Sequence, residues 1–396
     1  MTKKSDAPAI RFKGFSDAWE QRKLGDIASD IVAGGDIDKD LILAEGQYPV
    51  IANALTGDGI VGYYDKEYRV NAPAVTVTGR GDVGHAKTRL VNFTPVVRLL
   101  SVKSEHDVFF LENAINTLKI VIESTGVPQL TVPQLAKYEV AFPRQLDEEK
   151  HIGAFFKQLD HLITLHQRKF EKLTNVKKSM LEKMFPQNGS SYPEIRFKGF
   201  TDPWEQRKFD EVFDCTVPNN TLSRAELSYD EGTVLNVHYG DVLIKYGSVL
   251  DVQKDDIPRI PHRCREDFNG ALLQDGDVII ADTAEDETTG KACEIGNLQG
   301  SAIVSGLHTM VCRPRNRMAL GYLGYYLNSN AYHHQLLPLM QGIKVLSLSR
   351  SNIQKTSVSY PIAVKEQQLI AYYFSQLDNL ITLHQRKFEK LTNVKK

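Results

Sequence analysis

The amino-acid sequence predicts a mixed α/β (α+β) protein built as two related halves, and three observations support this fold class. Residues 10–23 (IRFKGFSDAWEQRK) recur at 195–208 (IRFKGFTDPWEQRK), with twelve of fourteen positions identical. Residues 156–178 recur at 374–396, with 21 of 23 positions identical. The segments between the repeats differ from each other and are rich in β-branched and apolar residues. The pattern predicts one constant frame that holds two different globular bodies.

The first body, residues 16–146, follows an N-terminal segment of residues 1–15 and is predicted to be rich in strands. Strands are expected at 48–54, 59–65, 68–84 and 89–102, where apolar and β-branched runs are broken by Gly, Pro and Asn. A helix is expected near Leu111–Ser124, and GVPQLTVPQL (126–135) is expected to be extended. The segment EVAFP (139–143) should close the body as a strand that ends at proline.

The second body, residues 189–363, repeats this layout loosely. Residues 232–247 and 275–286 are predicted to be strand–turn segments, and residues 318–340 are predicted to be helical. The segment TSVSYPIAV (356–364) mirrors the closing strand of the first body, 218 residues further along the chain. The equivalent closing strands indicate one fold used twice.

Two long helices, residues 147–188 and 364–396, are predicted to follow the two bodies. Their apolar positions recur at steps of four and three residues, which is the 3.5-residue seam of a coiled coil. The seam residues are Leu159, Ile163, His166, Phe170 and Leu173 in the first helix and Leu377, Ile381, His384, Phe388 and Leu391 in the second. Each stripe alone would face water, so we expect the helices to pack antiparallel about a pseudo-twofold axis. The helical pattern of the first helix runs from about Glu148 to Phe185, about 37 residues, so at 1.5 Å per residue it would be about 55 Å long. His166 and His384 are expected to specify register rather than to carry chemistry.

Composition excludes several classes of protein. The chain has 396 residues and contains no apolar run of 18 residues, and its N-terminus lacks an apolar signal core, so we expect a cytoplasmic protein without membrane contacts. Cys215, Cys264, Cys293 and Cys312 all lie in the second body without CxxC spacing. They are predicted to be reduced, mostly buried thiols rather than a disulfide framework or a zinc site.

The charge distribution gives only a local signal. The net charge is −1, so there is no overall basic signature of nucleic-acid binding. Residues 68–103 hold six Lys and Arg against one acid, and residues 157–183 hold seven against three acids. A solvated helix face and ordinary surface charge explain either stretch as well, so charge alone leaves the function open.

The motifs of common catalytic sites are absent. The chain lacks the G-x4-GK-[ST] phosphate loop, HExxH, G-x-S-x-G and the [DNS]-PP-[YF] turn of amino-methyltransferases. The segment GRGDVG (79–84) fits G-x-G-x-x-G, but the residues after it do not open a helix, so we expect a loop between strands. His333 and His334 are expected to be surface or core residues. We therefore predict neither a catalytic residue nor a metal site.

Several segments together carry a resemblance to a known family. They are the half-repeat itself, WEQRKLGDI (19–27), GVPQL (126–130) before the closing strand, and the helix starts EEKHIGAFFKQLDHLI (148–163) and KEQQLIAYYFSQLDNLI (365–381). Over essentially the whole chain they resemble the specificity (S) subunit of type I restriction–modification systems. One departure is that the second helix stops at NVKK, where the first continues SMLEKMF.

The resemblance implies a non-catalytic subunit whose two bodies are target recognition domains, each reading one half of an asymmetric bipartite site in double-stranded DNA. It implies that the helices set the spacer between the half-sites and dock two modification (methyltransferase) subunits, and through them two restriction (translocase and nuclease) subunits. It implies no cofactor on this chain, because S-adenosylmethionine, ATP and Mg belong to the partner subunits. Two alternatives stay open: an enzyme with its own site, and a coiled-coil scaffold without DNA contacts.

Candidate DNA-contacting residues follow from charge and from Gly-bearing loops. In the first body they are Thr78, Arg80, His85, Lys87 and Arg89. In the second body they are Lys245, Tyr246, Thr283, Glu285, Lys291 and Lys344. These residue types bind phosphates or read base edges. The target sequence and the length of its spacer do not follow from the sequence.

Overall fold

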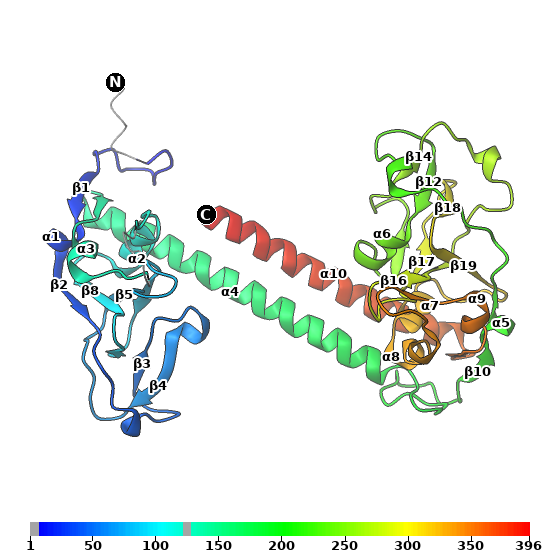
Figure 1. Cartoon of the computed structure of the whole chain (residues 1–396), viewed down its shortest axis with the longest axis horizontal. Helices are drawn as coiled ribbons and strands as arrows, with labels where there is room; N and C mark the ends of the chain where they lie inside the picture. The colour runs from blue at the N-terminus through cyan, green and yellow to red at the C-terminus, as the bar shows by residue number, and fades with distance from the viewer. Residues whose placement is uncertain (1–7, 122–127) are drawn as a thin grey trace. The chain divides into compact units, whose positions relative to one another are not determined.

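The computed structural model describes residues 8–121 and 128–396, which form two compact units (Figure 1). Unit 1 contains the residues up to Leu165 together with Phe388–Lys396, and unit 2 contains His166–Lys387. Two long helices, α4 (Leu146–Lys183) and α10 (Val364–Lys395), each contribute residues to both units. The predicted mixed α/β fold with two long helices is confirmed.

Unit 1 is built mainly on antiparallel strands. A four-stranded sheet has the order β2 (Ala28–Ala33), β8 (Leu100–Ser104), β5 (Ala74–Val77) and β6 (Ala86–Arg89). A three-stranded sheet has the order β4 (Ile60–Tyr64), β3 (Tyr48–Ile51) and β7 (Thr94–Pro95), and its β3 and β7 pair in parallel. The short helices are α1 (Leu24–Ile27), α2 (Val108–Asn116) and α3 (Val132–Ala136). The main core lies where Val75, Val77 and Val102 meet Leu111 and Ile115 of α2.

Unit 2 has a larger sheet. Its order is β11 (Phe213–Asp214), β19 (Thr309–Pro314), β15 (Val278–Ala281), β17 (Ala292–Gly296) and β13 (Val249–Asp251). A second sheet has the order β14 (Arg259–Ile260), β12 (Val234–Val237) and β18 (Ala302–Ser305), and β16 (Thr283–Ala284) pairs with β20 (Leu346–Ser347). The short helices are α5 (Phe209–Val212), α6 (Tyr239–Ile244), α7 (Tyr322–Leu327), α8 (Asn330–His333) and α9 (Arg350–Ile353).

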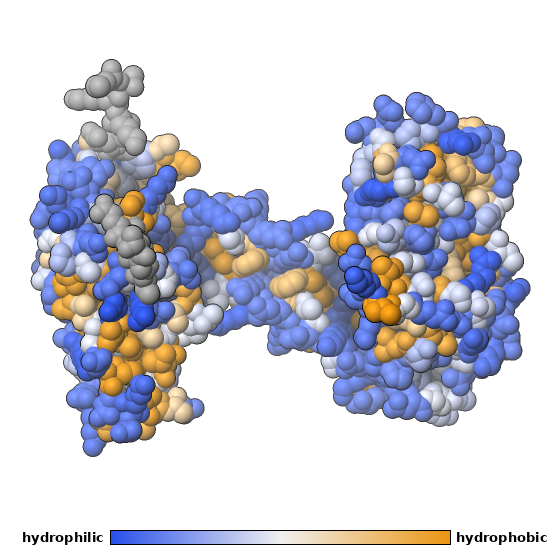
Figure 2. All heavy atoms as spheres, viewed as in Figure 1, coloured by the Kyte–Doolittle hydropathy of each residue, from blue (hydrophilic) through white to orange (hydrophobic). Residues whose placement is uncertain are grey.

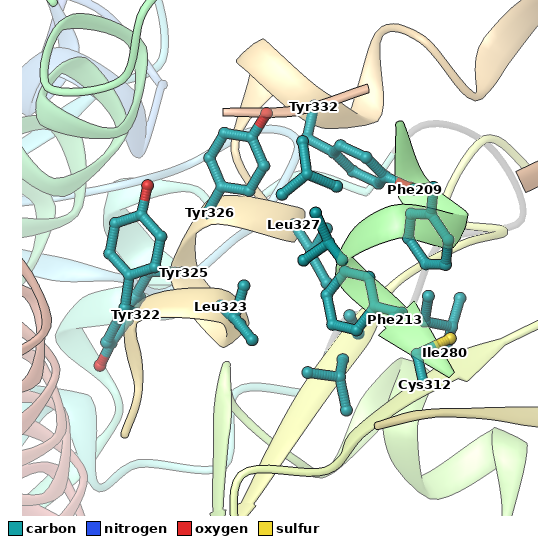
Figure 3. Close-up of a cluster of buried hydrophobic side chains, with 14 of the residues drawn as sticks. Phe209, Phe213, Ile280, Cys312, Tyr322, Leu323, Tyr325, Tyr326, Leu327 and Tyr332 are labelled. Carbon is teal, nitrogen blue, oxygen red and sulfur yellow. The ribbon is translucent and has the colours of Figure 1, made fainter. Parts of the chain in front are cut away.

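The core of unit 2 is rich in aromatic residues. Figure 3 shows Tyr322, Tyr326 and Tyr332 gathered near Phe209 and Phe213 in one buried cluster. The hydroxyl of Tyr322 donates a hydrogen bond to the carbonyl of Ser359 at 2.9 Å, so this buried phenol is satisfied. The same cluster receives Leu173, Val176 and Met180 of α4, which ties the C-terminal part of that helix to unit 2.

The repeated segments form the same structure in both units. In unit 1, β1 (Glu20–Lys23) pairs with β9 (Glu139–Phe142), and Glu20 lies opposite Phe142. In unit 2, β10 (Glu205–Lys208) pairs with β21 (Ser357–Tyr360), and Glu205 lies opposite Tyr360. The entry segment therefore pairs with the closing strand in the same antiparallel register each time.

A buried carboxylate fixes each long helix to its entry segment. Arg11 donates through Nε and Nη2 to the two carboxylate oxygens of Glu148 at 2.6 and 2.7 Å, and Trp19 Nε1 donates to the same group at 3.4 Å. In unit 2, Arg196 makes the equivalent contacts with Glu366 at 2.7 and 2.9 Å. We call these two arrangements the helix clamps.

The two long helices make antiparallel contacts. Within unit 2, Lys177 Nζ lies 2.5 Å from Asp378 Oδ1, and within unit 1, Lys395 Nζ lies 2.5 Å from Asp160 Oδ1. His166 and His384 meet in unit 2 with their Nδ1 atoms 2.8 Å apart. Lys177 and Asp378 are equivalent to Lys395 and Asp160, 218 residues away in the sequence, so the same ion pair occurs once in each unit. Desolvation and the charges of Lys169 and Lys387 lower the pKa of His166.

The seam residues are more covered than the helix positions beside them. Leu159 and Leu377 are buried. The other seam positions are half-buried: Ile163, His166, Phe170, Leu173, Ile381, His384, Phe388 and Leu391. Leu162, Leu165, Leu380 and Leu383, which flank the seam, are exposed.

Four local expectations are corrected. The helix expected at Leu111–Ser124 begins earlier, because Asp107 accepts hydrogen bonds from the backbone N–H groups of Phe109 and Phe110 as an N-cap. Its expected end at 122–124 lies outside the described residues. So do Gly126 and Val127, the first two residues of the segment 126–135 that was expected to be extended. The segment expected to be extended contains α3, which has a Thr131–Gln134 capping box and proline in its first turn. The segment 232–247 is a strand followed by α6, and the single helix expected at 318–340 is divided between α7 and α8.

Candidate nucleic-acid interface

The basic residues of unit 1 lie on an edge strand. Strand β6 is the outer strand of its sheet, and its register pairs Thr76 with Lys87 and Val77 with Ala86. Side chains alternate between the faces of a strand. Val77 and Ala86 therefore enter the core, and Lys87 and Arg89 lie on the opposite face.

Thr78 stabilises the loop between β5 and β6 through hydrogen bonds on its buried side. This residue is buried, its hydroxyl donates to the carbonyl of Asp82, and its Oγ1 accepts the N–H of His85 at 3.0 Å. Gly84 has φ +92°, and a Cβ there would lie 2.9 Å from Ile120. As predicted, GRGDVG connects two strands. Thr78 is corrected from a DNA contact to a residue that supports the loop, because its side chain is buried and its hydroxyl is hydrogen-bonded within the loop.

The Arg89 side chain also makes hydrogen bonds within unit 1. Its Nε donates to Thr76 Oγ1 at 3.0 Å, and its Nη1 donates to the carbonyl of Asp58 at 2.9 Å. Desolvation lowers the pKa of the Arg89 guanidinium. Lys87 Nζ lies 3.3 Å from Asp58 Oδ1, with both side chains more than half exposed. A surface pair of this kind contributes little energy, so Lys87 can exchange Asp58 for a phosphate.

Arg80 and His85 are the most available of the predicted residues in unit 1. Both are exposed, and neither side chain makes a hydrogen bond or ion pair with any other residue that the structure describes. The backbone of Arg80 bridges to Gln129, and the Gln129 side chain accepts a hydrogen bond from Arg98. The sequence prediction missed Gln129 because its link to the loop depends on pairing across 49 residues of chain.

In unit 2 two of the predicted residues serve the fold. Tyr246 is 3% exposed and belongs to the core, and burial raises the pKa of its hydroxyl, so its assignment as a DNA contact is corrected. Lys291 Nζ donates to the carbonyl of Leu243 at 2.9 Å, and desolvation lowers its pKa. Lys245 remains exposed, although its Nζ pairs with Asp256 at 2.8 Å and lies 4.6 Å from the Tyr229 ring centre.

The remaining predicted residues of unit 2 come together around the β16–β20 pair. Thr283 lies opposite Ser347, and the loop that leads to β20 is closed by two backbone hydrogen bonds between Gln341 and Ser347, at 3.0 and 2.8 Å. Glu285 follows β16 and Lys344 lies in the closed loop, and both are exposed. Lys291 connects this region to the end of α6. Strand pairing thus places the 283–285 segment beside the 341–347 loop, and together they form one surface.

Two neighbours on this surface were not predicted. Ile343, next to Lys344, is fully exposed, and His308 Nδ1 lies 3.4 Å from both Thr283 Oγ1 and Asp282 Oδ1. His308 reaches Thr283 only because β19 pairs with β15, placing Thr309 opposite Ala281. No local pattern in the sequence contains that information.

No group of three or more His, Cys, Asp or Glu side chains among residues 8–121 and 128–396 is arranged to hold a metal ion. Within the same residues, every helix is too short or too polar to cross a lipid bilayer.

If Arg80 contacts DNA as the sequence predicts, replacing it by Ala should weaken DNA binding by about 1–3 kcal/mol, the amount typical for loss of a bidentate arginine–guanine contact. Fluorescence anisotropy with cognate and unrelated duplexes at one salt concentration measures both affinity and specificity. Arg144→Ala is the matched control, because Arg144 is exposed in the same unit and pairs with Glu20 at 3.0 Å, outside the 78–89 surface. Unchanged affinity and target in Arg80→Ala would remove Arg80 from the interface.

Comparison with known proteins agrees with this organisation. Residues 16–175 and 201–393 match the family model for the type I restriction modification DNA specificity domain. A putative type I specificity subunit of Mycoplasma pneumoniae is 32% identical over 137 residues, which are 33% of this chain and 37% of that relative. A second from the same organism is 28% identical over 160 residues, 39% of this chain and 47% of the relative. The chain thus spans less than half the length of these two relatives.

Two further matches extend over nearly the whole chain. The MjaVIII type I restriction enzyme specificity subunit of Methanocaldococcus jannaschii is 22% identical over 402 residues, covering 96% of this chain and 90% of that protein. The crystal structure of a type I restriction–modification S subunit from M. genitalium matches with a TM-score of 0.59 at 14% identity, over 97% of this chain and 95% of the other. The latter is a likeness of fold. On the family match to both halves, this chain belongs to the type I restriction modification DNA specificity domain family.

Proposed function

We propose that this chain is the DNA-specificity subunit of a type I restriction–modification complex. The observation that carries the proposal is a pair of different bodies on one repeated frame. The frame has the same strand register and the same helix clamp in both units. A constant frame with variable bodies suits a protein that reads two unrelated half-sites of one asymmetric double-stranded DNA target. Phosphate contacts would supply affinity, and a few polar side chains would read base edges.

The helices offer a surface for partner subunits. Leu162 and Leu165 are 40% and 36% exposed, and their equivalents Leu380 and Leu383 are 43% and 45% exposed. Figure 2 shows apolar side chains at the surface along the helical part of the chain. We assign this repeated apolar surface to two modification subunits, through which two restriction subunits would join. In this proposal the chain acts in the cytoplasm without a catalytic group or cofactor, and S-adenosylmethionine, ATP and Mg are used by the partners.

The decisive test is an exchange of one body. Residues 209–345 begin after β10 and end before β20, so replacing them with the corresponding body of a relative leaves the frame of unit 2 at both ends. We expect one half of the methylated target to change and the other half to persist, as read by methylome sequencing of cells that express the hybrid with its modification partner. The reciprocal exchange, in the first body, is the control and should change the other half. A hybrid that alters both halves together would contradict separate reading by the two bodies.

A further inference from the structure

Two cysteines face each other in the sheet of unit 2. Strands β11 and β19 pair antiparallel with Phe213 opposite Pro314 and Asp214 opposite Arg313, which places Cys215 opposite Cys312. Their Sγ atoms are 3.3 Å apart, and the two residues are 7% and 1% exposed. Figure 3 shows Cys312 beside Phe213 and Ile280 in the buried cluster.

The strand geometry at this position suits a disulfide. The N–H of Arg315 donates to the carbonyl of Val212 at 2.8 Å, so residues 212 and 315 form a hydrogen-bonded pair. Such pairs alternate with non-hydrogen-bonded pairs along an antiparallel ladder, whose Cα atoms are about 4.5 Å apart. Cys215 and Cys312 fall on a non-hydrogen-bonded position. That spacing lies within the range of about 4.4–6.8 Å for disulfides, so side-chain rotation alone can close the bond.

The two thiols are electronically different. The hydrogen bond with Cys312 and the nearby charges of Arg350 and Arg315 lower the pKa of Cys215 against the effect of burial. The same hydrogen bond and burial raise the pKa of Cys312. Cys215 is also the more exposed of the two thiols, at 7% against 1%, so we assign it as the nucleophile that peroxide reaches first.

We propose that Cys215 and Cys312 form a peroxide-sensitive thiol pair that oxidises to a disulfide within unit 2. The Cys215 thiolate attacks hydrogen peroxide: an S–O bond forms, the O–O bond breaks, and the departing hydroxide takes a proton to become water. The Cys312 sulfur then attacks the sulfenic acid: the S–S bond forms, the S–O bond breaks, and the hydroxyl leaves as water with the Cys312 proton. Two thiols lose two electrons in total, and one peroxide becomes two waters.

The bond would tie the edge strand β11, which follows the entry segment β10–α5, to β19 inside the sheet. The site is specific to unit 2, because the first body contains no cysteine. The proposal does not depend on the DNA-specificity function. Cys293 is fully buried, and burial raises its pKa to about 12, so it should not compete.

The test uses the full chain carrying Cys264→Ser, which removes the exposed thiol. The folded protein is treated with hydrogen peroxide, denatured and alkylated, and its peptides are mapped by mass spectrometry without reduction. We expect Cys215 and Cys312 to lose their free thiols together, a cross-linked 215–312 peptide, and an unfolding midpoint that rises and returns on reduction. With Cys312→Ser added, Cys215 should stop at a sulfenic acid that dimedone traps. With Cys215→Ser added, Cys312 should stay reduced.

The wild-type chain supplies an internal standard, since its exposed Cys264 reports that the peroxide dose is effective. If Cys264 is oxidised while Cys215 and Cys312 both remain open to alkylation after denaturation, the thiol pair is not a peroxide site. Oxidation of Cys312 in the Cys215→Ser variant at the wild-type rate would equally overturn the assignment of Cys215 as the nucleophile.

Discussion

Inserting four residues after Lys172 should lengthen the gap between the two halves of the DNA target by one or two base pairs while each half-sequence survives. Four helical residues add about 6 Å along the axis and about 40° of net rotation. On DNA, 6 Å is nearly two steps of about 3.4 Å each. In α4, Lys172 lies between His166, which contacts His384, and Lys177, which contacts Asp378. The insertion therefore displaces one contact relative to the other. Methylome sequencing of cells expressing the variant measures the spacer directly.

The matched control inserts seven residues after Lys172 and seven after Asn379, which lies opposite on the antiparallel partner. Seven residues preserve the phase of the heptad seam, and the paired insertion keeps both the Lys177–Asp378 and the His166–His384 contacts. Its spacer should grow by about three base pairs, since seven residues add about 10.5 Å. An active enzyme whose spacer keeps its length in both variants would show that the helices do not set it. Loss of methylation in the four-residue variant alone would show that the seam phase, rather than helix length, limits assembly.

The frame could be predicted because its information is local and repeated. The seam spacing of each long helix lies within one continuous segment. The two copies of EQRK form the equivalent strands β1 and β10. The bodies were less predictable. In α6, the segment YGDVLI is β-branched enough to be interpreted as strand, yet the His238 side chain accepts the N–H of Gly240 and starts a helical turn. Between α7 and α8, Ser329 is fully buried and its hydroxyl donates to the carbonyl of Tyr326, which interrupts an otherwise continuous helical pattern.

In the candidate interface, too, local sequence patterns predicted some features and missed those that depend on long-range pairing. Charge and glycine identified the Arg80 loop and the Glu285–Lys344 region as surfaces. Charge does not show which polar side chains are buried or already hydrogen-bonded within the protein. Thr78 and Tyr246 are buried, and the guanidinium of Arg89 is already bound to Thr76 and Asp58. Such partners arise from strand pairing across tens of residues, for which a single sequence carries no local signal.

Replacing Arg196 by Met should destabilise unit 2 by about 3–5 kcal/mol, the usual cost of removing one partner from a buried ion pair. The Glu366 side chain is 1% exposed, and Arg196 binds both of its oxygens at 2.7 and 2.9 Å. Without the guanidinium, the carboxylate keeps, among side chains of residues 8–121 and 128–396, the Trp204 Nε1 hydrogen bond at 3.3 Å alone. Methionine preserves the apolar stem of arginine, so the loss reports the charge rather than a cavity. Denaturant unfolding followed by the fluorescence of Trp204, with Trp19 replaced by Phe in the Arg196 and Glu366 variants and their reference chain, measures the change in unit 2.

The double variant Arg196→Met, Glu366→Gln separates an unpaired charge from lost packing. A neutral amide keeps the shape of the carboxylate, so the double variant should recover a large part of the lost stability. The repeat supplies an independent copy: Arg11→Met, opposite Glu148 in unit 1, should lower the stability of that unit in the same way, as followed by Trp19 with Trp204 replaced. A loss below about 1 kcal/mol in unit 2 would mean that water replaces the guanidinium, as at an exposed pair. The entry segment of unit 2 would then be positioned by strand pairing alone, and its helix clamp would not hold α10 in place.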